Sequence, residues 1–204
     1  PWALFVGFVA PHMPLVVPQE YLEPYLATAG LPKLHPEAGY RRHPWVERMA
    51  QFWDHDAALM TQERRSLARA CYFGLVSFLD AQIGRVLRAL IETGLETTTT
   101  VIYSSDHGDN LGARGLWNKS TLYRESVGVP LIVAGPGVPR NIVRMTNVGL
   151  VDIYPTTLDA SGIALLPEEA DLPGESLIKL ARSDDDSARL GFSEYHAVGA
   201  ESAA

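Results

Sequence analysis

The sequence predicts an α/β fold with a mostly parallel central sheet flanked by helices, and three observations support this. A short continuous apolar run at residues 2–9 is typical of a strand that is covered on both faces. A long helical stripe follows at residues 63–93, and two further strands are expected at residues 99–103 and 129–134. Strands that alternate with helical segments favour a parallel sheet.

The first strand is expected to stop at Ala10-Pro11-His12-Met13-Pro14, because proline cannot donate a hydrogen bond to a sheet. Residues 17–61 are rich in Pro, His, Trp and Arg and show weak periodicity. They predict a long excursion that contains one short helix near Trp45–Trp53. Loops of this length inside compact domains are often functional.

A single long helix is the clearest element of the sequence. Apolar residues recur three and four positions apart from residue 63 to residue 93. Thr61 is expected as the N-cap of this helix, and Gly94 as the residue just beyond its C-terminal end. Cys71, the only cysteine, lies on the apolar stripe, where a thiol behaves as a small apolar group. We therefore expect Cys71 to be buried and not to act as a nucleophile.

The second half of the chain predicts two strands and a helix. The strand at residues 99–103 leads directly into Asp106-His107, and the strand at 129–134 ends in a turn at Gly135-Pro136-Gly137. A helix is expected at residues 151–162, and an acidic loop at residues 183–188 before a last strand. In α/β sheets the active site lies beyond the C-terminal ends of the strands, which is where His12 and Asp106-His107 fall.

Composition limits the possible classes of protein. The chain has 204 residues, enough for one domain, and a formal net charge of −7 without a basic stripe, so we expect no nucleic-acid partner. No apolar run approaches the roughly 18 residues of a membrane helix, so we expect no membrane partner. Because Pro1 leads at once into an apparent core strand, we expect the chain to be a fragment of a longer protein. The compartment and the oligomeric state stay open.

Asp106 and His107 are adjacent metal-ligand residue types on a turn that contains glycine. A carboxylate oxygen and an imidazole nitrogen can both bind one divalent cation from such a turn. Gly108 would let the backbone leave the turn without a steric penalty. The alternative is an aspartate that caps the next helix beside an exposed histidine. Two ligands also make an incomplete site, so others must come from elsewhere.

His12 and Lys119 are candidates for chemistry on an ester. A neutral imidazole is suited to proton transfer, and a fixed ammonium group can bind an anion. The alternatives are a loop histidine that faces solvent and an ordinary solvated lysine. The other histidines show no ligand spacing; the first three are assigned to loops, and the last is a weak candidate on the substrate side: His35, His43, His55 and His196.

Several segments, in the right order along the chain, resemble the sulfatase family. They are the helical stretch Tyr72–Gly84, the segment Ser105–Gly112 with its continuation Gly115–Glu125, the strand Val129–Gly137, the helix start Val151–Thr156, and Pro11-His12-Met13-Pro14. Sulfatases belong to the alkaline phosphatase superfamily. The resemblance therefore implies part of an alkaline phosphatase-like sandwich over residues 1–204.

The resemblance also implies roles for individual residues. Asp106 and His107 would be two ligands of a single divalent cation, Lys119 would bind the sulfate oxygens, and His12 would protonate the leaving-group oxygen. The Asp-His form is similar to the branch of choline sulfatases and phosphonate monoester hydrolases. Ca²⁺ is the expected metal, and an imidazole ligand makes Mn²⁺ plausible.

Two parts of the family pattern are absent from the chain. The paired aspartates that complete the metal site should precede Pro1. Neither Cys71 nor Ser120-Thr121-Leu122-Tyr123-Arg124 matches the Cys/Ser-Xaa-Pro/Ala-Xaa-Arg segment in which formylglycine, the nucleophile, is formed.

The sequence therefore predicts the C-terminal part of the catalytic domain of a sulfuric ester hydrolase. This part should be inactive alone, and the intact enzyme should act on a small anionic ester. The alternatives are a phosphonate monoester or phosphodiester hydrolase, and a non-catalytic member that only binds.

Overall fold

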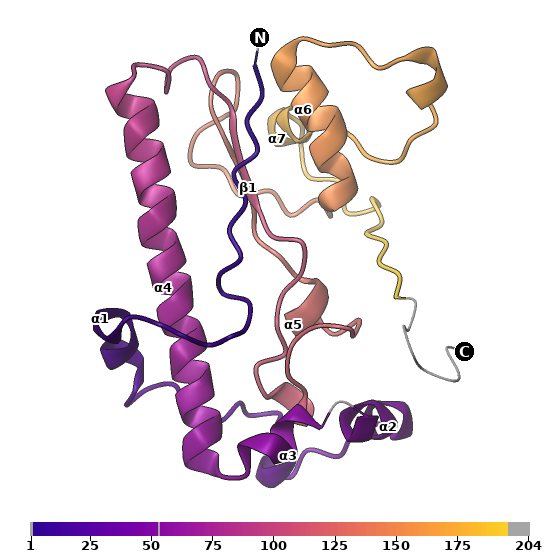
Figure 1. Cartoon of the computed structure of the whole chain (residues 1–204). Helices are drawn as coiled ribbons and strands as arrows, with labels where there is room; N and C mark the ends of the chain where they lie inside the picture. Colours follow the sequence, from indigo (N-terminus) through magenta and orange to yellow (C-terminus); the bar gives the residue numbers. More distant parts are fainter. Residues whose placement is uncertain (1, 53, 196–204) are drawn as a thin grey trace. The chain divides into compact units, whose positions relative to one another are not determined.

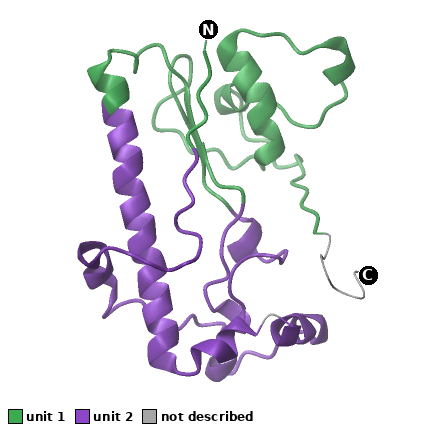
Figure 2. Ribbon diagram, viewed as in Figure 1, with its two compact units in different colours: residues 1–6, 89–106, 129–204 green, residues 7–88, 107–128 purple. Residues whose placement is uncertain are grey.

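The computed structural model describes residues 2–52 and 54–195 (Figure 1). The chain divides into two compact units, which Figure 2 colours separately. Unit 1 comprises residues 1–6, 89–106 and 129–204, and unit 2 comprises residues 7–88 and 107–128.

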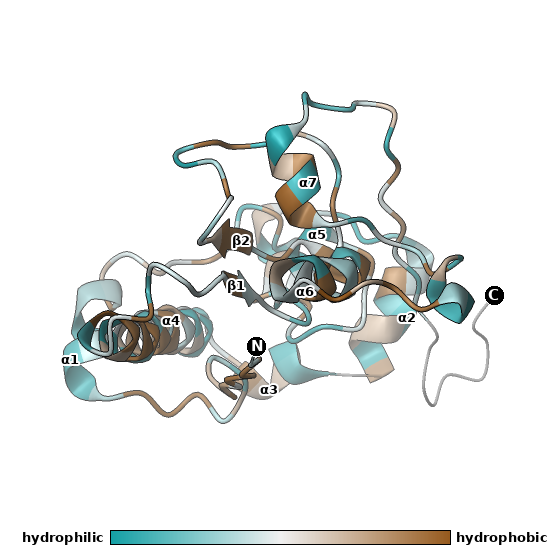
Figure 3. Ribbon diagram, turned by 90° about the horizontal axis from the view of Figure 1, so that it is seen from above, coloured by the Kyte–Doolittle hydropathy of each residue, from teal (hydrophilic) through white to brown (hydrophobic). Residues whose placement is uncertain are grey.

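Unit 1 contains a pair of short strands and a pair of helices. Its elements are the last turn of α4 (Gln62–Glu92), then β1 (Val101–Ser104), β2 (Leu131–Ala134), the 3₁₀ turn η4 (Leu150–Asp152), α6 (Ile153–Ser161), η5 (Pro167–Glu169) and α7 (Leu177–Arg182). The two strands pair antiparallel, with Val101 opposite Ala134 and Ser104 opposite Leu131. Both are coloured as hydrophobic in Figure 3. The strands, and the helix expected at residues 151–162, are confirmed within a few residues.

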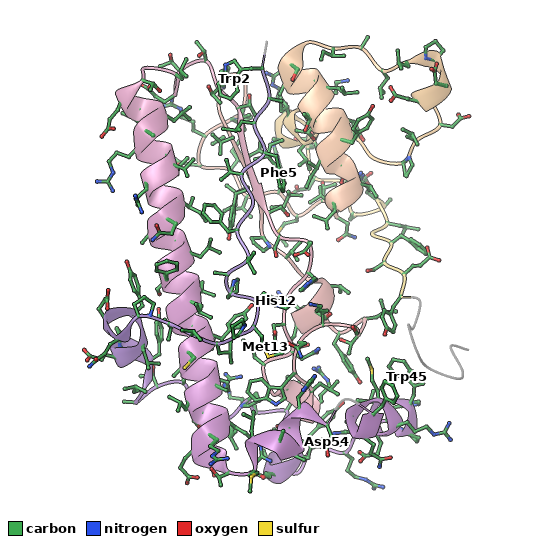
Figure 4. The ribbon with its side chains drawn as sticks, viewed as in Figure 1. Trp2, Phe5, His12, Met13, Trp45 and Asp54 are labelled. Carbon is green, nitrogen blue, oxygen red and sulfur yellow. The ribbon has the colours of Figure 1, made fainter. Side chains whose placement is uncertain are left out.

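The expected parallel sheet is not observed in residues 2–52 and 54–195. There, β1 and β2 form the sheet, antiparallel, and residues 2–9 are extended without a strand partner. Trp2 and Phe5, labelled in Figure 4, are exposed, Phe5 to 92%. An apolar run indicates that a segment is suited to burial, but it does not determine which strand it pairs with. No strand begins at residues 191–195, and His196 lies outside the described residues.

Gly135 explains how the chain can enter the turn after β2. Its φ is +140°, and a Cβ at this position would lie 2.7 Å from both the Cα of Thr100 and the carbonyl oxygen of Thr99. A side chain there would collide with backbone that cannot move aside. The turn predicted at Gly135-Pro136-Gly137 is therefore confirmed, and close backbone approach adds to the reason for glycine.

Helices α6 and α7 are joined by buried hydrogen bonds. Thr156 is fully buried, and its Oγ1 accepts a hydrogen bond from the backbone N–H of Leu177 at 2.8 Å. The Ser176 hydroxyl donates to Asp159 Oδ2 at 2.5 Å. Leu177 and Ile178 are also buried. The short helix α7 is therefore held to α6 by both polar and apolar contacts.

Asp152 is a fully buried carboxylate at the start of α6. It accepts hydrogen bonds from the backbone N–H groups of Gly149 and Glu175, both at 2.8 Å, and from Arg189 Nη2 at 2.6 Å. Burial acts to raise the pKa of Asp152, but the hydrogen bonds from Arg189 and the two N–H groups outweigh it, and the pKa lies below its usual value. Asp152 thus connects η4 to residues 175 and 189.

Unit 2 is mainly helical. Its elements are α1 (Gln19–Leu22), η1 (Glu23–Tyr25), η2 (Pro36–Ala38), α2 (Pro44–Phe52), α3 (His55–Leu59), most of α4 (Gln62–Glu92), η3 (Ala113–Gly115) and α5 (Arg124–Val127). Helix α2 confirms the short helix expected near Trp45, although Trp53 lies outside the described residues. Its buried residues Val46 and Ala50 pack with Leu116.

Helix α4 confirms both of the predicted ends. The Thr61 hydroxyl accepts a hydrogen bond from the N–H of Arg64 at 3.3 Å, and Gly94 has a φ of +71°. The apolar stripe is less completely covered than expected: Leu79 is buried, but Ile91 is 60% exposed. Cys71 is half-buried rather than buried, and burial raises the pKa of its thiol. Periodicity identifies an apolar face but not how much of it neighbouring segments cover.

Helix α4 is also long and apolar enough to cross a membrane, although no membrane helix was predicted from the sequence. Core helices of soluble proteins meet the same criterion of length and composition. In unit 2 this helix packs on protein. The Arg69 guanidinium donates to the carbonyl oxygens of Ala29 at 2.8 Å and Leu111 at 2.6 Å. Gly74 lies where a Cβ would be 2.8 Å from the carbonyl oxygen of Tyr21.

A buried cluster of charged side chains surrounds Asp56 in α3. Its Oδ1 accepts hydrogen bonds from Trp117 Nε1 at 2.8 Å and Arg65 Nε at 3.1 Å, and lies 3.3 Å from His35 Nε2. Arg65 also donates to Glu37 at 2.7 Å. Burial acts to raise the pKa of Asp56, but hydrogen bonds from Trp117 and His35 and the charge of Arg65 outweigh it, so the pKa is lowered.

The assignment of His35 to an ordinary loop was incomplete. Its side chain is buried, and it accepts a hydrogen bond from the N–H of Glu37 at the start of η2. Its contact with Asp56 lies 21 positions away in the sequence, so local composition could not indicate the burial of His35.

Candidate catalytic site

The structure brings His12 and Lys119 together within unit 2, although 107 positions separate them. Lys119 Nζ lies 2.8 Å from His12 Nε2. The other ring nitrogen of His12, Nδ1, lies 2.8 Å from the carbonyl oxygen of Met13, its neighbour in Figure 4. A carbonyl oxygen can only accept, so Nδ1 carries a proton in this contact, and Nε2 accepts the hydrogen bond from Lys119.

Asp106 and His107 follow β1, as the sequence predicted. Asp106 is exposed and accepts a hydrogen bond from the Ser105 hydroxyl at 3.4 Å. His107 Nδ1 lies 2.9 Å from the carbonyl oxygen of Gly108, which again requires a proton on Nδ1. The alternative role for Asp106, capping the next helix, does not fit, because the next helical element begins only at Ala113.

Gly108 is required by close approach rather than by a positive φ. Its N–H donates to the carbonyl oxygen of Ser126 at 2.7 Å. A Cβ on Gly108 would lie 2.1 Å from the carbonyl oxygen of Glu125, which no real Cβ tolerates. The segment after His107 therefore packs closely against α5. The prediction from the sequence explained Gly108 by the turn alone and did not include this packing.

The chemistry of Asp106 and His107 suits a divalent cation, but their number does not complete a site. A metal-binding imidazole commonly donates its other N–H to a carbonyl oxygen, as His107 does to Gly108. Within residues 2–52 and 54–195, no group of three or more His, Cys, Asp and Glu side chains is placed to hold a metal ion. Metal binding by Asp106 and His107 therefore stays a prediction from the sequence.

Asp109 and Asn110 lie close to His107 and Lys119, and no role was predicted for them from the sequence. Burial raises the pKa of Asp109 above its usual value, although the N–H groups of Leu111 and Asn118 and the charges of His107 and Lys119 act in the opposite direction. One local signal was available, because aspartate often accepts a hydrogen bond from the N–H two residues ahead. Leu111 donates such a bond at 2.8 Å.

Comparison with known proteins shows that the chain is similar to sulfatases and to a phosphonate monoester hydrolase. The structure is similar to phosphonate monoester hydrolase SpPMH from Silicibacter pomeroyi, with a TM-score of 0.68 and 31% identity over 87% of this chain and 37% of that one. In sequence it is 33% identical to choline-sulfatase of Rhizobium meliloti over 184 residues, which cover 88% of this chain and 35% of the relative. It is 38% identical to mouse arylsulfatase K over 138 residues, 68% of this chain and 24% of the relative.

The family model for sulfatases matches residues 1–163. The chain belongs to the sulfatase family, and it spans about a third or less of the length of the relatives it matches.

Proposed function

We propose that the chain forms part of a sulfuric ester hydrolase in which Lys119 binds the anionic group and His12 protonates the leaving group. The observation that carries the proposal is the 2.8 Å contact between Lys119 Nζ and His12 Nε2. It joins an anion-binding ammonium group and a proton-transfer group at one point, and His12 is exposed there. Family membership supports the reaction class.

The tautomer of His12 suggests how the two groups would act in turn. Without an anion, Nε2 accepts a hydrogen bond from Lys119 and so holds no proton there. An ester oxygen would offer Lys119 a negatively charged acceptor, and the Coulomb attraction between the two charges is absent from its contact with a neutral imidazole. Lys119 would then turn to the ester, and the exposed Nε2 would take up a proton from solvent and donate it to the leaving oxygen.

The remaining parts of the reaction are inferred from the family. Asp106 and His107 would supply two ligands to one divalent cation, Ca²⁺ or Mn²⁺, which when bound would stabilise negative charge on the ester oxygens. A formylglycine would provide the nucleophile, and none of the 204 residues lies in a segment that matches its motif. Cys71, half-buried on α4 with a raised pKa, is unsuited to that role.

The test uses the intact enzyme and a series of aryl sulfates with different leaving groups. Lys119→Ala should slow all of them by about 10²–10³, the usual effect of losing one charge-stabilising donor. His12→Ala should slow esters with poor leaving groups by about 10²–10⁴ and those with good ones much less. Equal losses across the series would reject His12 as the acid. The 204-residue chain with Ca²⁺ or Mn²⁺ should show no turnover.

A phosphonate monoester or phosphodiester hydrolase is the second candidate. Two observations favour it: the similarity to SpPMH and the Asp106-His107 pair, which resembles that branch. Comparing kcat/KM for an aryl sulfate and an aryl phosphonate monoester in the intact enzyme separates the two. The larger value identifies the substrate class.

A further inference from the structure

The loop that carries Lys119 is held in an unusual backbone conformation. Six residues between 111 and 120 have a positive φ: Leu111, Gly112, Arg114, Gly115, Asn118 and Ser120. Lys119 itself stands between Asn118, with a φ of 63°, and Ser120, with a φ of 75°. Apart from glycine and asparagine, residues seldom adopt this conformation unless the surrounding structure holds them in it, as at Ser120. The loop must therefore contain contacts that hold the backbone on both sides of Lys119.

Asp109 and Asn110 hold the backbone before Lys119, and Asn110 also contacts the side chain of Thr121 after it. Asp109 Oδ1 accepts hydrogen bonds from the N–H groups of Leu111 at 2.8 Å and Asn118 at 3.1 Å. Asn110 donates to the carbonyl oxygen of Asn118 twice, from its backbone N–H at 2.7 Å and from Nδ2 at 2.6 Å. Asn110 is buried, and its Oδ1 accepts a hydrogen bond from the Thr121 hydroxyl at 3.3 Å. Both the N–H and the C=O of the residue before Lys119 are thus fixed.

We propose that Asp109 and Asn110 are positioning residues that hold the backbone of Lys119, so that its Nζ stays within reach of His12 and of the ester anion. This inference rests on the proposed function for the role of Lys119. A lysine side chain has a flexible four-carbon stem, so its end can be placed only if its backbone is fixed. Hydrogen bonds between Asn118 and the pair Asp109 and Asn110 supply that constraint.

The geometry separates an acceptor role for Asp109 from a role for its charge. Both N–H groups bind the same oxygen, Oδ1. An asparagine at this position can present its single carbonyl oxygen to both donors, whereas an alanine cannot. Asp109→Asn should therefore keep the loop closed, and Asp109→Ala should open it. A proton-transfer or metal-ligand role would instead be lost equally in both variants.

Lysine labelling measures the position of Lys119 without any reaction on an ester. The chain has three lysines, Lys33, Lys119 and Lys179, so trace acetylation of the intact protein followed by mass spectrometry gives each rate separately. Asp109→Ala should raise the rate at Lys119 relative to Lys33 and Lys179 by about fivefold, which is the equilibrium change that one hydrogen bond is typically worth. Asp80→Ala, an exposed acid on α4, is the matched control.

Kinetics of the intact enzyme give the second measurement. Asp109→Ala should lower kcat by up to about 10²-fold with a smaller change in KM, because a small displacement of a catalytic group has that effect. Asp109→Asn should recover most of the rate and the labelling ratio of the unaltered protein. Loss in Asp109→Asn as large as in Asp109→Ala, or an unchanged labelling ratio in Asp109→Ala, would overturn the proposal.

The two proposals can fail separately. If Asp109→Ala exposes Lys119 but Lys119→Ala leaves ester hydrolysis unchanged, the positioning role stands and the function of Lys119 is wrong. If labelling of all three lysines rises together in Asp109→Ala, that variant has unfolded. The Asp109→Asn variant then decides whether Asp109 acts as a hydrogen-bond acceptor for the loop. A normal Lys119 ratio in that variant supports the acceptor role, and a raised ratio rejects it.

Discussion

Replacing Asp56 by alanine should destabilise unit 2 more than any exposed acid would. The carboxylate is the common partner of Arg65, Trp117 and His35 and therefore ties α3 to α4, to the start of η2 and to the loop that follows η3. Its side chain is only 13% exposed and that of Arg65 only 8%, so water replaces little of what is lost.

The magnitude follows from the partners left behind. Removing one member of a buried ion pair typically costs about 3–5 kcal/mol, but Arg65 keeps its contact with the half-exposed Glu37, which favours the lower limit. The indole N–H of Trp117 loses its partner, which adds about 1–3 kcal/mol if it stays buried. We expect a total loss of about 4–6 kcal/mol, a large part of the roughly 5–15 kcal/mol that stabilises a typical domain.

Urea unfolding followed by tryptophan fluorescence measures this loss. The matched control is Asp54→Ala, two residues earlier in the chain. Asp54 is exposed and caps α3 through a hydrogen bond from the N–H of Ala57, so its loss should cost about 1 kcal/mol. If Asp56→Ala cost no more than Asp54→Ala, the carboxylate would not hold these segments together.

The same carboxylate predicts a dependence of stability on pH. The pKa of Asp56 in the folded protein lies below its usual value, so its contribution is present above the unfolded pKa and is lost as the pH falls through the folded one. Lowering the pH from about 7 to about 3 should therefore destabilise the unaltered protein more than Asp56→Ala. Parallel losses of unfolding free energy in the two proteins would contradict this.

Two further substitutions test local features of the backbone. Gly108→Ala should displace the segment after His107, because its Cβ would meet the carbonyl oxygen of Glu125. The thermal unfolding temperature should fall by several degrees. The control is Gly149→Ala, where nothing lies within 4 Å of the added Cβ, and it should change the unfolding temperature little. Met60→Gly should raise the unfolding free energy by about 0.5–1 kcal/mol, because Met60 has a φ of 61° and is 70% exposed. Met60→Ala should give no such gain, and an equal gain would show that φ is not the cause.

Local signals in the sequence were sufficient for the elements that depend on near neighbours. Thr61 and Gly94 mark the ends of α4, because capping involves residues three or four positions apart. The strands near residues 101 and 131 were also found from short β-branched and apolar runs. Their antiparallel pairing was not, because strand direction depends on which segments meet in the fold.

The candidate site was only partly accessible from the sequence. The resemblance to sulfatases selected His12 and Lys119, and the structure places their nitrogens within hydrogen-bond distance. The contacts of Asp109 and Asn110 with Asn118 span eight or nine residues of an irregular loop, a separation at which neither helical nor strand periodicity carries information. The buried His35 was missed for the same reason.

The hydrogen bond from Leu177 to Thr156 has a practical consequence for choosing where to cut the chain. The sulfatase family match stops at residue 163, just after α6, but α7 supplies buried donors and apolar side chains to α6 from beyond that limit. Trimming at the edge of the family match would leave the Thr156 hydroxyl facing water and expose the surface that Leu177 covers. Expression boundaries for this region should therefore follow its buried hydrogen bonds rather than the extent of sequence similarity.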